Sequence, residues 1–380
     1  MSDLSPSDSE PLPAPAGWYP LKLVPSFRER IWGQQDLSFL YPRRPPEPSR
    51  IGEVWLTADD NCIENGVWAG KTLGHTSRTY SATLLGRAAG RNGTPAASFP
   101  LLVKFLFTAG KLSVQVHPSD AYAMEHHGSA GKTEMWHVLK ASPGAQLAIG
   151  FREEASRSHG PDPEGLRKAI ESGDIEKWLN WMNVRAGDTF FIPAGTVHAI
   201  GAGMTLCEIQ QNSDITYRLY DYKRPGTDGR PRALHVEQAL EVIAYRTPGG
   251  LTEPLEYRAQ GGSRICLAAC PYFATDKISL SDSARFATGE RCEVWIGLDG
   301  EAEFEASGQR AICRMGEAIV LPAQAQEFSI TLQSPCTFLR TYRPDLEKDV
   351  IAPLLAAGFS RQQLGRVCFP AATLPASNQA

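Results

Sequence analysis

The chain has 380 residues, of which 42% are hydrophobic, so it is long and apolar enough for two or three domains with sizeable cores. Its 38 basic and 42 acidic residues leave a net charge of −4, without a long basic run. We therefore expect neither a nucleic acid nor an anionic membrane as a partner. The eight cysteines are scattered and form no C-x-x-C pair, which is typical of free thiols in a reducing compartment, and predicts a cytoplasmic protein.

The N-terminal part predicts a tail followed by strands. Residues 1–17 are rich in proline and serine and have neither a basic n-region nor an apolar h-region, so we expect a disordered tail and not a signal peptide. From residue 18 to about residue 152, short strand-like runs alternate with glycine and proline, which is typical of an all-β barrel. Lys104 is a single charge inside the apolar run LLVKFL, and a buried lysine needs a partner.

The segment 112–117, LSVQVH, alternates as a strand does. Side chains of successive strand residues point to opposite faces, so Ser113, Gln115 and His117 are expected on one face. A carboxamide and an imidazole are thereby placed side by side.

The segment 132–139, KTEMWHVL, also predicts a strand, with Lys132 and Glu134 on one face. A connection rich in turn residues would let this strand lie beside the preceding one. The two strands together would gather a carboxamide, an imidazole, a carboxylate and an amine. Such nitrogen and oxygen groups suit hard-to-borderline metals.

A small helical insertion is predicted at about 153–183. Asp162 and Pro163 form a helix start, with aspartate as the N-cap and proline at the first helical position. Asp174 is expected to cap a second helix that carries an apolar stripe as far as residue 182. A third helix is expected at about 235–244.

The segment 187–198, GDTFFIPAGTVH, predicts a buried strand, a tight turn and then His198 on the next strand. Its spacing, G-x5-P-x-G-x2-H, resembles the second signature motif of the cupin barrels, whose histidine binds the metal.

These segments together resemble the type I mannose-6-phosphate isomerases (phosphomannose isomerases), in the shorter form common in bacteria. The matching motifs occur in family order: FRERIWG (27–33), IGEVWLTAD (51–59), FPLLVKFLFTAGKLSVQVHPSD (99–120), GKTEMW (131–136), FFIPAGTVHAIGAG (190–203) and CEIQQNSDITYRLYDY (207–222). The resemblance implies a mainly β fold of two cupin (jelly-roll) barrels. It also implies interconversion of mannose 6-phosphate and fructose 6-phosphate, a small sugar phosphate as the partner, and one Zn²⁺ per chain. The family ligands Gln, His, Glu and His fall on Gln115, His117, Glu134 and His198.

The resemblance also suggests catalytic roles. Lys132, two residues before a ligand, is expected to act as general base or acid on the substrate. Glu208 stands where a glutamate is proposed as catalytic in eukaryotic members, so it is an alternative base. The guanidinium of Arg218 does not readily lose a proton, and its expected task is to stabilise an oxyanion. Lys104 is expected to bind the substrate phosphate, and Ser113 to donate to the phosphate or to a sugar hydroxyl.

Two other functions compete with the isomerase. Two histidines and a carboxylate also form the facial triad of non-haem iron oxygenases. Gln115 as a fourth ligand, together with Lys132 and Arg218, argues against that reading. The other competitor is a sugar-binding or regulatory cupin without turnover, and the losses at Lys132 or Arg218 that would favour it are not seen.

The C-terminal half contains an internal repeat. The frame from Gly316 to Glu327 repeats the frame from Gly187 to His198, but glutamate stands at the ligand position. Since residues 250–345 contain no histidine, we expect a second cupin barrel without a metal site.

The predicted division of the chain therefore has three parts after the tail. Residues 18–249 form the catalytic domain, residues 250–345 the degenerate barrel, and residues 346–380 a helical segment with a loose end from Pro370. Ser360 and Gln363 predict a capping box in the last part.

Overall fold

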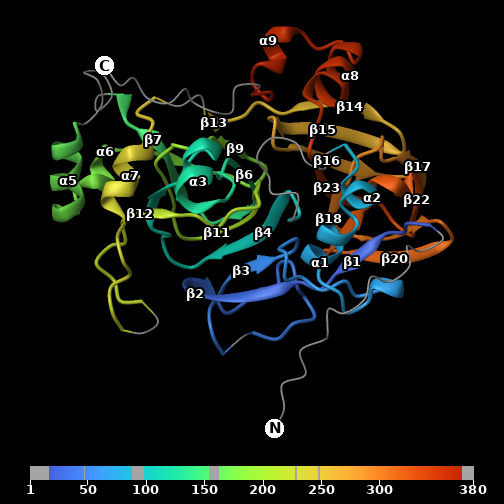
Figure 1. Cartoon of the computed structure of the whole chain (residues 1–380), viewed down its shortest axis with the longest axis horizontal. Coiled ribbons are helices and arrows are strands. Elements are labelled where there is room, and N and C mark those ends of the chain that lie inside the picture. The colour runs from blue at the N-terminus through green and yellow to red at the C-terminus, as the bar shows by residue number, and fades with distance from the viewer. Residues whose placement is uncertain are drawn as a thin grey trace.

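The computed structural model describes residues 17–46, 48–87, 98–153, 162–226, 229–246 and 249–369. The predicted tail, apart from Gly17, and the loose end from Pro370 lie outside these residues. Two β-sandwiches lie side by side, each made of two antiparallel sheets (Figure 1). The predicted mainly β, cupin-like fold is confirmed, although the sheets form open sandwiches and do not close into barrels. No helix in the described ranges is long and apolar enough to cross a membrane.

The N-terminal sandwich pairs a seven-stranded sheet with a five-stranded one. The seven-stranded sheet contains, in spatial order, β13 (Gly250–Leu251), β9 (Thr189–Ile192), β6 (Glu134–Ala141), β11 (Met204–Gln211), β4 (Leu101–Thr108), β3 (Ile51–Trp55) and β2 (Ser26–Gln34). The five-stranded sheet contains β12 (Tyr217–Tyr220), β5 (Val114–Val116), β10 (His198–Ile200), β7 (Gln146–Phe151) and β8 (Leu179–Asn183).

The C-terminal sandwich pairs a seven-stranded sheet with a four-stranded one. The first contains β1 (Leu21–Leu23), β21 (Ala318–Leu321), β18 (Glu293–Asp299), β23 (Cys336–Tyr342), β16 (Ala274–Leu280), β15 (Gly262–Ala269) and β14 (Leu255–Ala259). The second contains β17 (Ala284–Ala287), β22 (Glu327–Leu332), β19 (Glu301–Ala306) and β20 (Gln309–Arg314). Trp295 of β18 meets Phe304 of β19 and Phe328 of β22 edge to face, so an aromatic core fills the space between these sheets.

Short helices occupy the connections. They are α1 (Leu73–Thr79), α2 (Ser81–Leu85), α3 (Asp120–His127), α5 (Pro163–Ser172), α6 (Ile175–Trp178), α7 (Val236–Val242), α8 (Ala352–Ala356) and α9 (Arg361–Leu364), with single turns η1 (Gly66–Trp68), η2 (Ala323–Ala325) and the π-helical η3 (Leu346–Ile351).

Lys104 lies in the middle of the apolar strand β4, and the position of this strand in the fold explains its composition. All eight of its residues are buried, because the seven-stranded sheet is covered on both faces. Leu101, Val103, Phe105 and Phe107 share one hydrophobic core with strands β15 and β16 of the C-terminal sandwich. Lys104 points the other way, into the cavity of the N-terminal sandwich. The apolar face of β4 therefore joins the two halves, and its opposite face lines the cavity.

The helical insertion covers the outer face of the five-stranded sheet (Figure 1). The predicted start of α5 is confirmed, because the Asp162 side chain accepts a hydrogen bond from the backbone N–H of Gly165. The second predicted helix is wrong in its extent. It ends at Trp178, Asp174 makes no side-chain cap, and Leu179 already begins β8, which pairs with β7. Helix α7 confirms the third predicted helix.

The division of the chain near residue 250 stays a prediction. The first strand, β1, pairs with β21, so Leu21–Leu23 lies with the C-terminal sandwich and not with the predicted catalytic part. The C-terminal segment begins helical as predicted, and the capping box between Ser360 and Gln363 is present. Phe369 then stacks on Phe191 of β9 with ring centroids 4.1 Å apart.

Candidate metal centre and active site

The candidate ligands come from two facing sheets. His198 opens β10 and lies directly opposite Gln115 of β5, while His117 follows β5 by one residue. Glu134 opens β6 in the other sheet. The expectation that strands 112–117 and 132–139 lie side by side is therefore wrong, since they face each other across the sandwich. Their connection includes helix α3 and is not built of turns alone.

A compact group of possible metal ligands results. The ligand atoms of His117, Glu134 and His198 all lie within 4.8 Å of one another, and the three side chains are buried. His117 Nε2 lies 3.6 Å from one Glu134 oxygen, and His198 Nε2 lies 3.4 Å from the other. No second group of three such residues occurs in the described part of the chain.

The backbone fixes which nitrogen of each histidine can bind a metal. His117 Nδ1 lies 2.8 Å from the carbonyl oxygen of Ile215, and His198 Nδ1 lies 2.9 Å from that of Thr196. A carbonyl oxygen only accepts, so Nδ1 carries the proton and Nε2 keeps its lone pair. Burial lowers the pKa of His117 well below its ordinary value and that of His198 to about 4. Both rings are thus neutral, which is the form that binds metal.

Gln115 lies next to these ligands but is held differently. Its Nε2 is 3.2 Å from His198 Nε2, and its Oε1 accepts a hydrogen bond of 3.0 Å from the Ser113 hydroxyl. Coordination through Oε1 requires the amide to turn over, because only the oxygen has a lone pair to donate.

Lys132 is brought into the site by a close backbone approach. A Cβ at Gly131 would lie only 2.5 Å from the backbone nitrogen of Asp120, so only glycine fits there. The Lys132 ammonium donates to His117 Nε2 at 2.9 Å and to Glu134 at 2.8 Å. A metal on His117 would need the same lone pair, so this hydrogen bond and metal binding exclude each other.

Glu208 and Lys104 form a buried pair beside the ligands. They face each other on β11 and β4, with Nζ and Oε1 3.5 Å apart. Burial, reinforced by the nearby Glu134 carboxylate, raises the pKa of Glu208. Burial opposes the charge on Lys104, but Glu208 and Glu53 outweigh it and raise the pKa of the lysine. Lys104 therefore already has carboxylate partners, and its predicted contact with phosphate stays a prediction.

All of these side chains except the buried histidines line one cavity of about 650 Å³. Arg218 also lines it, from β12 directly opposite Gln115. Its guanidinium donates to the carbonyl oxygen of Ala233 at 2.9 Å, and it forms no ion pair with any described residue. Ser113 lines the same cavity, so the predicted site residues converge there.

Sequence reasoning missed several residues of the cavity wall. These are Arg30, Trp32, Glu53, Asp214 and Arg232. Glu53 breaks the apolar strand β3 and binds Arg30 at 2.8 Å, so a charge within a buried strand was a usable signal for it. His137 points to the face of β6 opposite to Glu134, where it contacts Thr189.

Family models match two parts of the chain. The model described as "Phosphomannose isomerase type I, catalytic domain" matches residues 21–135, and the one described as "Mannose-6-phosphate isomerase, cupin domain" matches residues 265–342. The probable mannose-6-phosphate isomerase GmuF of Bacillus subtilis is 35% identical over 328 residues, which cover 84% of this chain and 98% of that protein. The chain belongs to the type I mannose-6-phosphate isomerase family.

Other members and solved structures agree with this assignment. The mannose-6-phosphate isomerase of Streptococcus mutans is 34% identical over 80% of this chain and 92% of its own length. The crystal structure of the mannose 6-phosphate isomerase of Bacillus subtilis, at 29% identity, gives a TM-score of 0.74 and covers 85% of this chain and 99% of that one. A zinc-bound mannose 6-phosphate isomerase at 18% identity shares the fold, with a TM-score of 0.66 over 85% of this chain and 99% of its own.

Proposed function

We propose that this protein is a zinc-dependent isomerase that interconverts mannose 6-phosphate and fructose 6-phosphate. The observation that carries the proposal is one cavity in which neutral imidazoles and a carboxylate lie beside Lys132, Glu208 and Arg218. The names of the family relatives support the same reaction.

The proposed ligands of the zinc ion are Gln115, His117, Glu134 and His198. The donor set fits, because two imidazole Nε2 atoms and a carboxylate converge and each imidazole is oriented by a backbone carbonyl. When bound, the ion would supply Lewis acidity that polarises oxygens of the substrate.

The chain's own residues move the proton and hold the negative charge. Lys132 or Glu208 takes the proton from C2 of the opened aldose and returns it to C1, while a hydroxyl proton passes from O2 to O1. The cis-enediol stage between these steps develops negative charge, and Arg218, which has no carboxylate partner among the described residues, can stabilise it. Lys104 and Ser113 are the proposed contacts of the phosphate.

We also propose a division of labour along the chain. Residues 18–249 hold the chemistry, residues 250–345 form a scaffold without metal, and residues 346–380 are a helical segment with a loose end. All eight cysteines are free, and seven are buried, which supports a reducing compartment and hence the cytoplasm.

A coupled assay for fructose 6-phosphate formation tests the function. Turnover is expected from mannose 6-phosphate and should be lost with a chelator. His198→Ala should lose zinc and activity while it stays folded, and the matched control His126→Ala, on the exposed face of α3, should keep both. Binding of mannose 6-phosphate without any turnover would favour the non-catalytic cupin instead. Full zinc content in His198→Ala would refute the ligand assignment.

A further inference from the structure

The C-terminal sandwich repeats the strand register around the metal centre. In the N-terminal sandwich, Glu134 pairs with Ile192, the residue before the proline of the cupin motif. In the C-terminal sandwich, Glu293 pairs with Leu321, which also precedes the proline of the repeated motif. Glu293 is therefore the counterpart of the candidate ligand Glu134, although the sequence motif alone pointed only to Glu327.

An oppositely charged pair lies on the two strands beside the glutamate in both sandwiches, but the acidic and basic residues have changed places. Glu208 lies opposite Lys104 in the first sandwich, and Arg340 lies opposite Asp276 in the second. Glu208 also pairs with Trp136, and Arg340 with Trp295. These tryptophans follow Glu134 and Glu293, respectively, by two residues. Arg340 binds Asp276 at 3.0 Å and approaches Glu293 to 3.5 Å.

The place of Lys132 is taken by Arg291. Each precedes its glutamate by two residues, and Arg291 binds Glu293 at 3.0 Å. The imidazole ligands have no counterparts, since Glu327 at the position of His198 is exposed and pairs with Ala287. In the second sandwich, guanidinium groups balance the charge of Glu293. In the first sandwich, a metal ion can balance the charge of the equivalent Glu134.

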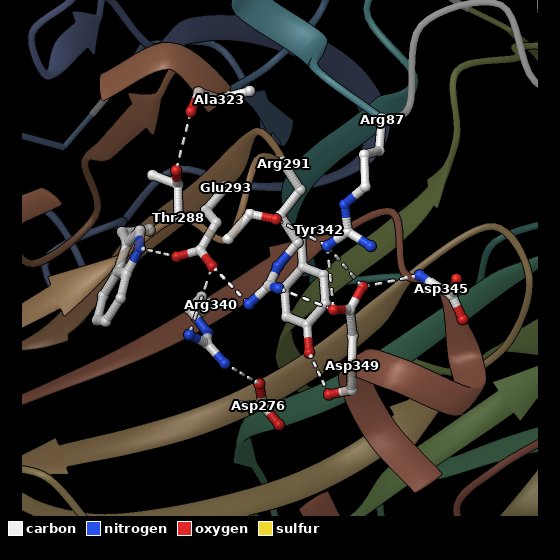
Figure 2. Close-up of polar contacts among 12 residues, drawn as sticks. Arg87, Asp276, Thr288, Arg291, Glu293, Ala323, Arg340, Tyr342, Asp345 and Asp349 are labelled. Atoms are coloured by element: carbon white, nitrogen blue, oxygen red, sulfur yellow. Dashed lines mark hydrogen bonds and ion pairs between the residues drawn. The ribbon is translucent and has the colours of Figure 1, made fainter. Parts of the chain in front are cut away.

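An internal carboxylate completes this second site. Asp349 of η3 is buried and accepts hydrogen bonds from Arg291 at 3.0 Å, from Arg87 at 3.1 Å and from the backbone N–H of Asp345 at 2.8 Å (Figure 2). Figure 2 shows these donors reaching Asp349 from different parts of the chain. Arg87 follows α2, whereas Arg291 lies two residues before β18. Charge-assisted contacts of this kind are the usual way in which proteins bind a small anion.

We propose that the C-terminal sandwich retains its counterpart of the metal centre as an anion-binding site, and that the bound anion is the protein's own Asp349 carboxylate. The site defined by Arg87, Arg291, Glu293, Arg340 and Asp349 is hereafter the arginine cluster. The contact at Asp349 fastens the start of the C-terminal segment 345–369, and the stacking of Phe369 on Phe191 fastens its end against the N-terminal sandwich. The segment is therefore a strap across both sandwiches. This inference does not depend on the isomerase reaction.

Replacement of Asp349 tests the anion site in the full-length protein. Asp349→Ala should lower the midpoint of thermal unfolding by on the order of 5 °C, because two partly buried guanidinium groups, those of Arg87 and Arg291, lose a carboxylate partner. Amide hydrogen exchange should become faster across residues 345–369. Formate, a free carboxylate that fits the space of the removed side chain, should restore part of the lost midpoint in this variant and have much less effect on the wild type.

Glu347→Ala is the matched control, because Glu347 lies two residues away in η3 and is exposed. It should change neither the midpoint nor the exchange rates. If formate raises the midpoint of Asp349→Ala no more than that of Glu347→Ala, the anion site is refuted. Unchanged exchange over 345–369 in Asp349→Ala would refute the strap.

A second variant covers the case in which Asp349→Ala does not fold. Arg87→Gln removes one of the two guanidinium donors and leaves the carboxylate in place. It should show a smaller loss of midpoint and faster exchange in the same segment, without rescue by formate. Wild-type exchange in Arg87→Gln would count against the proposal. Zinc content should stay at the wild-type level in all three variants, because the arginine cluster contains no zinc ligand.

Discussion

Lys132 and Glu208 are the two candidate bases, and their side chains lie 3.5 Å apart. Lys132→Met should keep zinc and lose about 10²–10⁴-fold in kcat, the usual contribution of general acid–base catalysis. Steady-state kinetics of Lys132→Met and Glu208→Gln, with zinc measured in both, check this. If Lys132→Met remains close to wild type while Glu208→Gln is inactive, the base is Glu208.

Titration of the Asp276 carboxyl should make the stability of the folded protein depend on pH. Burial raises the pKa of this carboxyl, but Arg264 and Arg340 outweigh burial and hold it below the ordinary value. The charged form is therefore favoured in the folded state, so its stabilisation is present above the unfolded pKa and is lost as pH falls through the folded pKa. The free energy of unfolding of the wild type should fall below about pH 4, the usual carboxyl range.

The matched variant is Asp276→Asn, which cannot take part in this titration. It should be less stable at neutral pH by about 3–5 kcal/mol, since the buried Arg340 and the partly buried Arg264 lose a charged partner. Its stability should also decline less steeply than that of the wild type over the acidic range. Parallel acid profiles of the two proteins would show that Asp276 does not contribute.

Residues of the site differed in how far the sequence could predict them. The meeting of Gln115, His117, Glu134 and His198 was predictable, because the resemblance to the family assigns all four to one site, although the strand pairing assumed between 112–117 and 132–139 was wrong. Arg30 and Asp214 were not, because no local signal marks them: Arg30 is one of several charged residues in β2, and Asp214 lies in the loop between β11 and β12. The hydrogen bonds of Lys132 to two ligand atoms also depend on the close approach at Gly131, which no spacing reveals.

Strand β22 provides a test at the scale of one element. Glu327 stands at its first residue, at the position of His198, but it is exposed and no metal-type group includes it among the described residues. Glu327→Ala should therefore leave zinc content and kcat/KM close to wild type. Glu134→Ala is the matched comparison and should lose zinc. A loss of zinc in Glu327→Ala would mean that the repeat carries a second ligand set.

Elements were predicted well where one local signal dominated. The Asp162 cap and the Ser360 capping box mark helix starts by chemistry within four residues, and both are present. The predicted second helix of the insertion was too long, because Leu179 and Met182 fit the apolar stripe of a helix as well as they fit an apolar strand. Pairing of β8 with β7 decides between the two, and that contact lies outside the local sequence.

The apolar interface between the two sandwiches should make each sandwich depend on the other for stability. A chain ending at residue 246 should be insoluble or unstable, because Leu101, Val103, Phe105 and Phe107 would expose the apolar face of β4. A chain ending at Phe369 is the control, since it keeps every described contact. Solubility and zinc-dependent activity of both fragments measure the outcome. A soluble and active 1–246 fragment would show that the scaffold role of the C-terminal half is wrong.

The pairing of β1 with β21 means that the first strand to be synthesised cannot fold until a late strand is present. Strand β1 leaves the ribosome early, but its partner is made only when most of the chain has been translated. Until then β1 must wait with an unpaired edge. Its closure spans nearly the whole sequence, and contacts between such distant residues form slowly. We therefore expect the first strand synthesised to be among the last to become protected from hydrogen exchange during refolding.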